Sequence, residues 1–415
     1  MRIAIVGSGI SGLTVAYLLH RSHEITLFEA DDRVGGHTHT VRVDSEHESH
    51  DLDTGFIVFN DRNYPNFERL MGRLGVSWQA SDMSFSVSDG RGAFEYASSS
   101  LNGLFANRRH LVSTSFARML LEVPRFQRAA LELLRAGDER ISLRGWMRAQ
   151  GFSRHFIDRL LVPQASAVWS ADPRQLWTFP ALFLARFFDN HGMLGLRGRP
   201  RWRTISGGSG RYVDALATGF RDRIHLGSPV RAITRGHDRV LVQVSGAEPL
   251  PFDHVVIATH SDQALAMLAD PTRCEREILG STPYQQNEAI LHTDRALLPV
   301  RQRAWASWNY HLLDEPSGRT TVTYHLNRLQ RLQSAEQFCV TLNLSERIDP
   351  ERVIKRITYA HPVYTPDGVA AQRRVGEISG LAGRTHFCGA YWGWGFHEDG
   401  VNSALRVATE FGARL

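Results

Sequence analysis

The chain has 415 residues, of which 42% are hydrophobic, and its formal net charge is +5 with histidine neutral. This length is sufficient for two domains with large cores. No apolar run reaches the ~18 residues that a membrane-spanning helix needs, and the first residues lack the pattern of a secretion signal. The composition therefore predicts a folded, cytoplasmic protein.

Arginine supplies nearly all of the positive charge, because Lys355 is the only lysine. Arginine binds planar anions such as phosphates, although a general preference for arginine over lysine explains the same composition. The sequence has no zinc-finger spacing, RNP-like run or repeat, so we expect no nucleic-acid partner. Cys274, Cys339 and Cys388 lie far apart without C-x-x-C spacing, which fits a reducing compartment.

The first predicted element is a strand that leads directly into a glycine-rich turn. The apolar run 3–6 is followed by three glycines with G-x-G-x-x-G spacing, then by a helical pattern and a second apolar run that ends on Glu29. In this order the turn and the helix N-terminus bind a pyrophosphate, and the acid accepts hydrogen bonds from a ribose. A purely structural turn is the alternative. The residues assigned to the nucleotide site are Gly7, Gly9, Ser11, Gly12, Glu29 and Ala30.

A second glycine pair follows the acid in the run ADDRVGGH, which contains Gly35 and Gly36 and ends at His37. These glycines offer more backbone N–H groups to the same pyrophosphate, a feature that a nicotinamide enzyme does not need. With this turn the chain resembles the flavin-dependent amine oxidase superfamily, whose FAD domain carries a GxGxxG turn, an acidic strand end and an RxGGR-like turn. His37 stands where that family has its last arginine. The resemblance implies FAD as the cofactor, with these three residues in its site.

The resemblance also implies a division into two domains. It places a Rossmann-like α/β FAD-binding domain at 1–60, 204–269 and 372–415, and an inserted α+β substrate domain at 61–203 and 270–371. The expected fold class is therefore the two-domain amine-oxidase type.

The stretch DLDTGFIVF, 51–59, predicts an acidic turn and then an apolar strand, followed by a loop and a helix over 65–74. By resemblance, the chain passes over the flavin ring here, with Gly55 and Phe56 beside the isoalloxazine. A hairpin strand with a glycine bend is the alternative.

Residues 101–203 have a mainly helical pattern. Within 115–135, apolar residues share one face and arginines the other, and Pro124 predicts a break between two helices. Such a pattern covers a core or lies in a membrane interface. The segment RGRPRWR, 197–203, then sets four arginines around Trp202, which suits lipid headgroups or an ordinary solvated loop. Peripheral contact with an anionic membrane is therefore a second prediction for localisation.

After a glycine-rich turn and helix over 205–216, the chain is expected to return to the FAD domain. Further FAD-domain strands are predicted at 224–230, 240–244 and 252–259. The resemblance implies that the backbone of Val230 holds the adenine. The strand candidates of the substrate domain are 288–292, 320–324 and 339–344.

The closing segment THFCGAYWGWGFHEDGVNSA, 385–404, predicts a strand, an aromatic loop and a helix that begins near Gly400. It resembles the closing motif of flavin amine oxidases and keeps Gly389. A helix N-terminus carries roughly half a positive charge and stabilises a reduced flavin. We therefore expect the Val401 N–H at the flavin pyrimidine edge, and Tyr391 and Trp392 on the substrate side of the ring. Plain core packing is the alternative for the two aromatic residues.

Many amine oxidases hold a water near the flavin with a lysine on a substrate-domain strand, but Lys355 lies outside the 284–292 stretch where that lysine is expected. We expect Asn287 or His292 to take this role. No metal site is expected, because the histidines at 37–50 lack a matched set of acids or cysteines.

The runs DTGFIVFN, FFDNHGML, TYHLNRLQ and CGAYWGWGFHEDG narrow the resemblance to a bacterial subgroup of predicted NAD/FAD-binding proteins associated with cyclopropane-fatty-acyl synthase-like enzymes. This association implies an FAD-dependent oxidoreductase that removes a hydride from a C–H bond of a lipid or fatty-acyl substrate. Two alternatives stay open: a flavin amine oxidase acting on a small amine, and a non-catalytic flavoprotein partner of a lipid-modifying enzyme.

Overall fold

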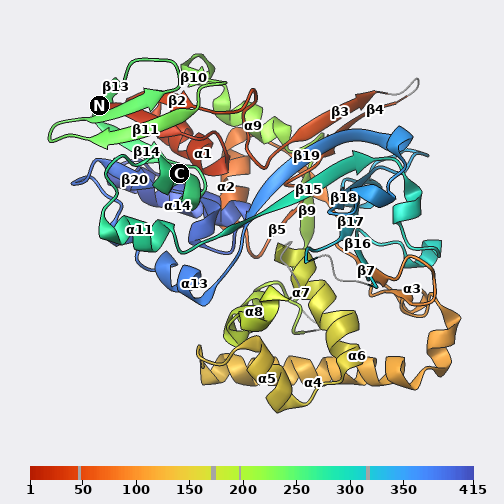
Figure 1. Ribbon diagram of the computed structural model, residues 1–415. Helices are drawn as coiled ribbons and strands as arrows, with labels where there is room; N and C mark the ends of the chain where they lie inside the picture. Colours follow the sequence, from red (N-terminus) through yellow and green to blue (C-terminus); the bar gives the residue numbers. More distant parts are fainter. Residues whose placement is uncertain (45–47, 170–173, 196–197, 315–317) are drawn as a thin grey trace.

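The computed structural model describes residues 1–44, 48–169, 174–195, 198–314 and 318–415. Figure 1 shows a nucleotide-binding domain that contains both chain termini, and a second domain made of a large sheet and a group of helices. Two long strands, β15 (Tyr284–His292) and β19 (Val353–Pro362), run from the first domain into the sheet of the second.

A five-stranded parallel sheet forms the centre of the nucleotide-binding domain. Its order is β10 (Ile224–His225), β2 (Glu24–Phe28), β1 (Arg2–Val6), β14 (His254–Ile257) and β20 (Thr385–Phe387). Both faces of the central strand are buried, as expected for a parallel sheet with layers on each side. Ile3 and Ile5 pack against helices, whereas Ala4 and Val6 pack against a small antiparallel sheet.

The helical layer of this domain consists of α1 (Ile10–Leu19), α2 (Pro65–Leu74), α9 (Gly210–Ala217) and α14 (His397–Glu410). The opposite layer consists of α10 (Ser261–Met267) and the strands β11 (Val230–Arg235), β12 (Val240–Val244) and β13 (Leu250–Phe252). The helix predicted at 65–74 is therefore present, but its packing places it with the nucleotide-binding domain rather than the substrate domain. The strand predicted over 224–230 is interrupted, because Gly227 adopts a left-handed conformation with φ of 57°.

A seven-stranded sheet forms the centre of the substrate domain. Its order is β19, β15, β18 (Cys339–Leu342), β17 (Val322–His325), β16 (Trp308–His311), β7 (Phe85–Ser88) and β8 (Glu95–Ala97). β19 was not among the predicted strands. It pairs with β15 in antiparallel register from Tyr284 opposite Pro362 to Leu291 opposite Lys355.

The helical part of the substrate domain contains α3 (Leu101–Leu104), α4 (Thr114–Ala136), α5 (Leu143–Gln150), α6 (Arg154–Phe156), α7 (Val162–Trp169) and α8 (Ala181–Asn190). The break predicted at Pro124 is wrong, since α4 continues through it. Pro124 lies on the exposed side, while Phe116 and Phe126 on either side of it are buried in one core. Tertiary packing of both halves therefore outweighs the hydrogen bond that proline removes. Within the described ranges, no helix is both long and apolar enough to cross a membrane.

Candidate functional site

A cavity of about 1400 Å³ lies between the two domains. Its nucleotide end is lined by both glycine turns, by Glu29 and by Val230. Its other end is lined by β-sheet residues and by the helices of the substrate domain. The volume exceeds the ~300–1,000 Å³ of a site for one drug-sized ligand, so the cavity has room for more than a nucleotide.

The three glycines of the first turn serve different purposes. A Cβ on Gly12 would lie 1.9 Å from the Gly7 carbonyl oxygen, so this glycine permits the contact between helix and strand. Gly7 has φ of 100°, a conformation that few other residues adopt. A Cβ on Gly9 would meet no protein atom within 4 Å, because Gly9 faces the cavity. This open space beside a helix N-terminus is the cradle that a pyrophosphate requires.

Glu29 directly follows β2 and lines the cavity. Its Oε2 accepts hydrogen bonds from the Ser8 N–H at 2.8 Å and the Ser8 hydroxyl at 2.5 Å, and its Oε1 accepts from the Asp31 N–H at 3.0 Å. The carboxylate is thus held in place beside Ala30, where a ribose is expected. Ser11 also lines the cavity, but its hydroxyl donates to the Gly400 carbonyl at 3.1 Å and joins α1 to α14.

The second glycine turn packs directly on the first. The Gly35 N–H donates to the Ser8 carbonyl at 3.0 Å, and a Cβ on Gly36 would lie 3.1 Å from the Gly9 Cα. Arg33 closes this turn through hydrogen bonds to the Gly36 carbonyl at 2.8 Å and the Thr38 carbonyl at 3.0 Å. The two turns therefore line the same end of the cavity, as the sequence predicted.

His37 follows the second turn and forms a cluster with two other histidines at the cavity wall. Its ring lies 5.1 Å from Tyr359, 5.4 Å from His361 and 5.8 Å from His260. Burial and repulsion from neighbouring cations lower the pKa of His37 and of His260 to about 4, and that of His361 to about 3. All three imidazoles are neutral near pH 7, so His37 does not replace the positive charge of the family's arginine.

Asn287 fixes the tautomer of His361. The Asn287 Oδ1 accepts hydrogen bonds from the side-chain amides of Gln285 at 3.1 Å and Asn343 at 2.8 Å, so its Nδ2 is the donor to the His361 Nδ1 at 2.9 Å. A ring whose Nδ1 accepts carries its proton on Nε2. His361 lines the cavity, and its Nε2 has no partner among the described residues. Asn287 therefore positions His361 and does not line the cavity itself.

His292 does not occupy the role expected for it. It is fully buried inside the sheet, where its Nε2 lies 2.7 Å from the Thr341 hydroxyl and its Nδ1 accepts from the Asp294 N–H at 3.0 Å. On β15 the His292 side chain shares a face with Tyr284 and Gln286, which line the cavity, but it lies at the far end of the strand and is not part of the lining. Lys355 lies on the exposed part of β19, where its Nζ is 3.4 Å from the His39 Nε2.

Gly55 and Phe56 lie at the cavity, but they are not part of a strand, although an apolar strand was predicted after the acidic turn within 51–59. Asp51 and Asp53 lie in β4 (Ser49–Asp53). Between Asp53 and Asn60, only the two residues of β5 (Phe59–Asn60) form a strand. The backbone between them follows the second turn, since the Phe56 N–H donates to the His37 carbonyl at 3.1 Å and a Cβ on Gly55 would lie 2.0 Å from that oxygen. The Phe56 ring stacks on His397 with 3.5 Å between centroids.

The prediction for Val401 is wrong because α14 begins at His397, not near Gly400. Val401 is the fifth residue of the helix and is fully buried, so its N–H belongs to the intrahelical ladder. The early start is fixed by Asp399, whose carboxylate accepts from the backbone N–H groups of Trp394 and Phe396 at 3.0 Å each. The first intrahelical bond runs from the Gly400 N–H to the Phe396 carbonyl, so the N–H groups that begin this helix are those of residues 397–399, and His397 lines the cavity.

The aromatic residues of the closing loop divide between the cavity and the core. Tyr391 lines the cavity together with Gly389, whereas Trp392 packs against the nucleotide-domain core and lies 5.7 Å from the Arg406 guanidinium. Trp394 and Phe396 line the cavity in the place expected for Trp392. The alternation follows the short 3-10 turn Ala390–Trp392, which directs successive side chains to different sides.

The far end of the cavity is apolar. Its lining includes Leu104, Leu120, Val123, Phe126, Leu161 and Phe188. Among the described residues that line the cavity, Glu29, Asp31, Arg33 and Arg231 lie at the nucleotide end, and Arg199 is the single charged residue of the remainder. The described residues also contain no group of three metal-ligating side chains; His47 lies outside them.

Comparison with known families gives a direct assignment. The model of the flavin-containing amine oxidoreductase family matches residues 10–327. The chain belongs to this family. FAD is accordingly its cofactor, the protein is an FAD-dependent oxidoreductase, and the cradle at Gly9 with the fixed carboxylate of Glu29 fits the nucleotide.

Two characterised relatives match only part of the chain. A 15-cis-phytoene desaturase of Capsicum annuum is 28% identical over 225 residues, which cover 48% of this chain and 37% of the desaturase. A flavin-dependent L-tryptophan oxidase of Lentzea aerocolonigenes is 25% identical over 292 residues, which cover 61% of this chain and 57% of the oxidase. The chain therefore aligns with little more than a third of the desaturase.

Solved structures match the whole fold. Cyclohexylamine oxidase from Brevibacterium oxydans IH-35A superposes with a TM-score of 0.70 at 16% identity, covering 99% of both chains. A CLA-producing fatty acid isomerase from P. acnes superposes with a TM-score of 0.67 at 16% identity, covering 99% of this chain and 98% of the isomerase. These similarities confirm the predicted two-domain amine-oxidase fold.

Proposed function

We propose that the protein dehydrogenates the acyl chain of a lipid, using FAD as the hydride acceptor. The observation that carries this proposal is the apolar end of the cavity, which holds no described carboxylate and only one charged side chain, Arg199. An acyl chain gains free energy from burial against such a surface, at ~0.8 kcal/mol per CH₂ group. The subgroup resemblance and its lipid association point to the same class of substrate.

A small amine is a poorer match to this cavity. An ammonium group that leaves water needs a carboxylate or several acceptors to offset its desolvation. The carboxylates among the described lining residues, Glu29 and Asp31, lie at the nucleotide end, and Glu29 is already hydrogen-bonded to Ser8. An anionic headgroup, in contrast, matches Arg199.

In the proposed reaction, one carbon loses a hydride and its neighbour loses a proton, which leaves a carbon–carbon double bond. Bound FAD supplies the hydride-accepting chemistry. The protein excludes water with its apolar wall and keeps His361 as a neutral Nε2–H donor through Asn287. The neutral imidazole of His260 is the proton acceptor at the cavity wall, and it is a weak base because burial lowers its pKa to about 4. A membrane surface and a lipid-modifying enzyme as partners are separate proposals that this reaction does not require.

The test is anaerobic mixing of the purified holoprotein with a monounsaturated phospholipid in detergent micelles, and separately with a small primary amine. Lipid should bleach the visible flavin absorbance and yield a product lighter by two hydrogens, and the amine should leave the flavin oxidised. Val123→Trp, which fills the apolar end, should slow reduction by lipid, and Leu226→Trp on the distant surface should not. Reduction by the amine alone would overturn the proposal.

A further inference from the structure

We propose that the outer side of the helices that wall the apolar end of the cavity is a docking surface for an anionic lipid bilayer. The surface consists of five exposed apolar residues, Leu101, Leu111, Val112, Leu121 and Val300, with Arg108, Arg109 and Arg118. It lies on and around α3, the 3-10 helix Arg108–Val112 and the first half of α4. This proposal rests on the proposed function in one respect: the bilayer is taken to supply the lipid substrate that the cavity binds.

The first observation is the concentration of exposed apolar side chains in one region. Val112 is 85% exposed, Leu101 77%, Leu121 74%, and Leu111 and Val300 62% each. Every other large apolar side chain of the described residues is 54% exposed or less. Single exposed apolar residues are common, but a group of the most exposed ones marks an interaction site.

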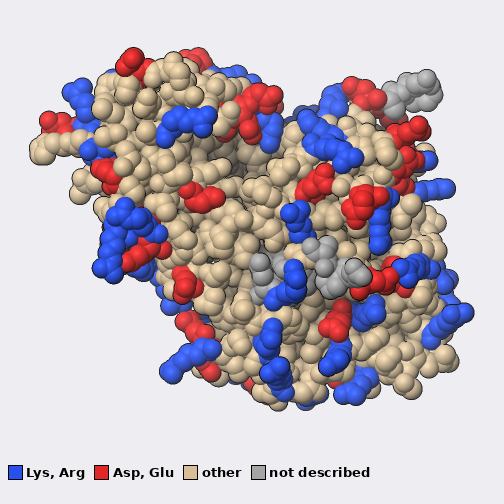
Figure 2. Space-filling model, viewed as in Figure 1, with Lys and Arg blue, Asp and Glu red and all other residues tan. Residues whose placement is uncertain are grey.

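The second observation is the charge around this group. Residues 96–121 contain three arginines and no aspartate or glutamate. The acids that flank this stretch are buried: Glu95 is fully buried, and Glu122 is buried where it accepts from the Ser153 hydroxyl at 2.5 Å and pairs with Arg118 at 3.3 Å. Arg108 and Arg109 are the arginines of the stretch without an ion pair among the described residues. Figure 2 shows blue side chains along the lower edge of the molecule, where α4 runs in Figure 1, with few red ones beside them. Arginines among exposed apolar residues match the interface of an anionic bilayer.

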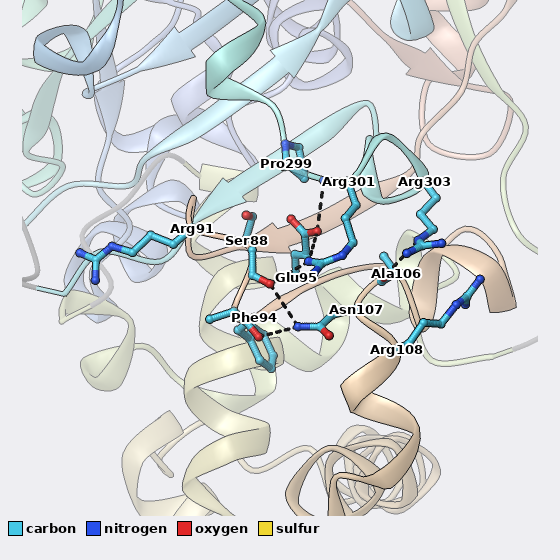
Figure 3. Close-up of polar contacts among 12 residues, drawn as sticks. Ser88, Arg91, Phe94, Glu95, Ala106, Asn107, Arg108, Pro299, Arg301 and Arg303 are labelled. Atoms are coloured by element: carbon cyan, nitrogen blue, oxygen red, sulfur yellow. Dashed lines mark hydrogen bonds and ion pairs between the residues drawn. The ribbon is translucent and has the colours of Figure 1, made fainter.

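The third observation is that the region is built rigidly. Asn107 is buried, and its side-chain amide donates to the Gly92 carbonyl at 3.1 Å and the Ala93 carbonyl at 2.7 Å (Figure 3). Arg301 pairs with the buried Glu95 at 2.6 Å and so fixes the loop that presents Val300.

Three more contacts join the parts of the surface. Arg303 donates to the Ala106 carbonyl at 2.9 Å, and Arg108 donates to the Phe105 carbonyl at 2.9 Å. The ring of His110 stacks on Phe116 with 4.1 Å between centroids, which joins the 3-10 helix to the start of α4. Exposed apolar residues on a fixed frame are presented to a partner without an ordering cost.

The fourth observation connects the surface to the cavity. Leu120 of α4 lines the cavity, and the next residue, Leu121, is exposed to solvent. Leu104, at the end of α3, also lines the cavity. Residues 114 and 121 of α4 are separated by about 10 Å along the helix axis, so Leu121 lies near the 3-10 helix. A bilayer on the outer side therefore lies one helix away from the site that takes an acyl chain.

This surface replaces the segment 197–203 as the membrane contact. Arg203 forms an ion pair with Glu68 and lies 5.5 Å from the Trp78 ring, and Arg199 lines the cavity. Arg197 lies outside the described residues. Of the described arginines of that segment outside the cavity lining, Arg201 alone is exposed without a side-chain partner among the described residues, as Arg109 is. The described part of the segment therefore offers one free arginine outside the cavity, and it has no exposed large apolar residue beside it.

The experiment is sedimentation of the FAD-loaded protein with vesicles of equal parts phosphatidylcholine and phosphatidylglycerol, and with vesicles of phosphatidylcholine alone. The parent should bind the anionic vesicles, and binding should fall when salt rises from about 0.15 M to about 1 M, because the Debye length falls from about 8 Å to about 3 Å. L111D/V112D should abolish binding. R109S should weaken it about fivefold, the contribution of one free arginine near the surface.

The matched control is L226D/L381D, which adds the same charge at two exposed apolar positions outside the surface. It should bind as the parent does, and retained FAD absorbance shows that each variant is folded. Absent binding by the parent, or full binding by L111D/V112D, overturns the proposal. So does a dimer of the parent, seen by sedimentation velocity without vesicles, that L111D/V112D dissociates, because the partner is then a second copy. Flavin reduction by micellar lipid tests the proposed function independently of vesicle binding.

Discussion

The two ends of the cavity differ in the kind of groups that line them. The nucleotide end is formed by backbone: two glycine turns in contact, a helix N-terminus and one carboxylate held by Ser8. The substrate end is formed by side chains that come from segments far apart, such as Leu120 of α4 and Tyr364 beyond β19. Backbone sites tolerate almost no change, while apolar walls tolerate changes of similar volume. Substitutions at the first end should therefore act on FAD, and those at the second on substrate.

The largest effect is expected for Glu29→Arg. The change removes the acceptor for the ribose and places a cation beside the Ser8 N–H that now donates to the carboxylate. FAD retention should be lost, as measured by the ratio of flavin to protein after purification. Glu24→Arg, on the exposed start of the same strand, is the control and should retain FAD. Full flavin content in Glu29→Arg would contradict the assignment of this end.

The next effect separates two glycines of one turn. Gly9→Ala adds a methyl group where no protein atom lies within 4 Å, so the FAD-free protein should unfold at an unchanged temperature while FAD affinity falls at least about tenfold. Gly12→Ala places its methyl group 1.9 Å from the Gly7 carbonyl and should destabilise the protein itself by about 1–3 kcal/mol. Calorimetry and FAD titration of both variants check this. If the two variants changed alike in unfolding temperature and in FAD affinity, Gly9 would not face a ligand.

The sequence predicted the nucleotide end closely because its signals are local. The strand, turn, helix and acid lie within residues 2–29, and each of them is present in the structure. The substrate end depends on β19, whose pairing with β15 joins residues more than sixty positions apart. No local pattern marks His361 as the partner of Asn287, so the sequence named Asn287 without the histidine through which it acts.

The start of α14 shows a second limit of local patterns. Gly400 is a plausible helix start from composition, but the carboxylate of Asp399 reaches back to the N–H groups of Trp394 and Phe396. This arrangement is a form of the capping box, in which an acid in the first turn bonds to the N-cap backbone. The Asp at the third helical position was the available signal, and with it the helix begins at His397 instead of near Gly400.

At the substrate end, the largest effect is expected for Asn287→Leu. The change removes the donor to the His361 Nδ1, so the imidazole can take its proton on either nitrogen and its pKa should rise. Reduction of the flavin by lipid should slow about tenfold or more if the Nε2–H donor assists the reaction. Thr341→Val, which removes the partner of the cavity-remote His292, is the control. Nitrogen NMR of the imidazoles distinguishes a changed tautomer from a general loss of structure.

A pH dependence of stability should follow from the same cluster. Burial holds the pKa of His37 and His260 at about 4 and that of His361 at about 3, below the 6.5 of an exposed histidine. Between pH 6.5 and 4 the unfolded chain binds protons that the folded protein does not, so stability falls as the pH falls. The unfolding temperature should be level above about pH 7 and then drop by ~2–4 °C for each kcal/mol lost. His37→Gln should make the unfolding temperature fall less between pH 6.5 and 4. If the variant has the same pH profile as the parent, the histidines of the cluster are in contact with water and do not have lowered pKa values.

The smallest effect is expected for Arg199→Gln, the one described charge at the substrate end. Arg199 is exposed at its outer side, so an ion pair with a lipid headgroup is weakened by solvent and is worth ~1 kcal/mol, or about fivefold in affinity. The KM for a lipid with an anionic headgroup should rise by this factor at unchanged kcat, and the KM for phosphatidylcholine should change less. Arg201→Gln, two residues along and outside the cavity lining, should leave both constants as they are. An equal rise in KM for both lipids would mean that Arg199 shapes the wall of the cavity and does not bind the charged headgroup.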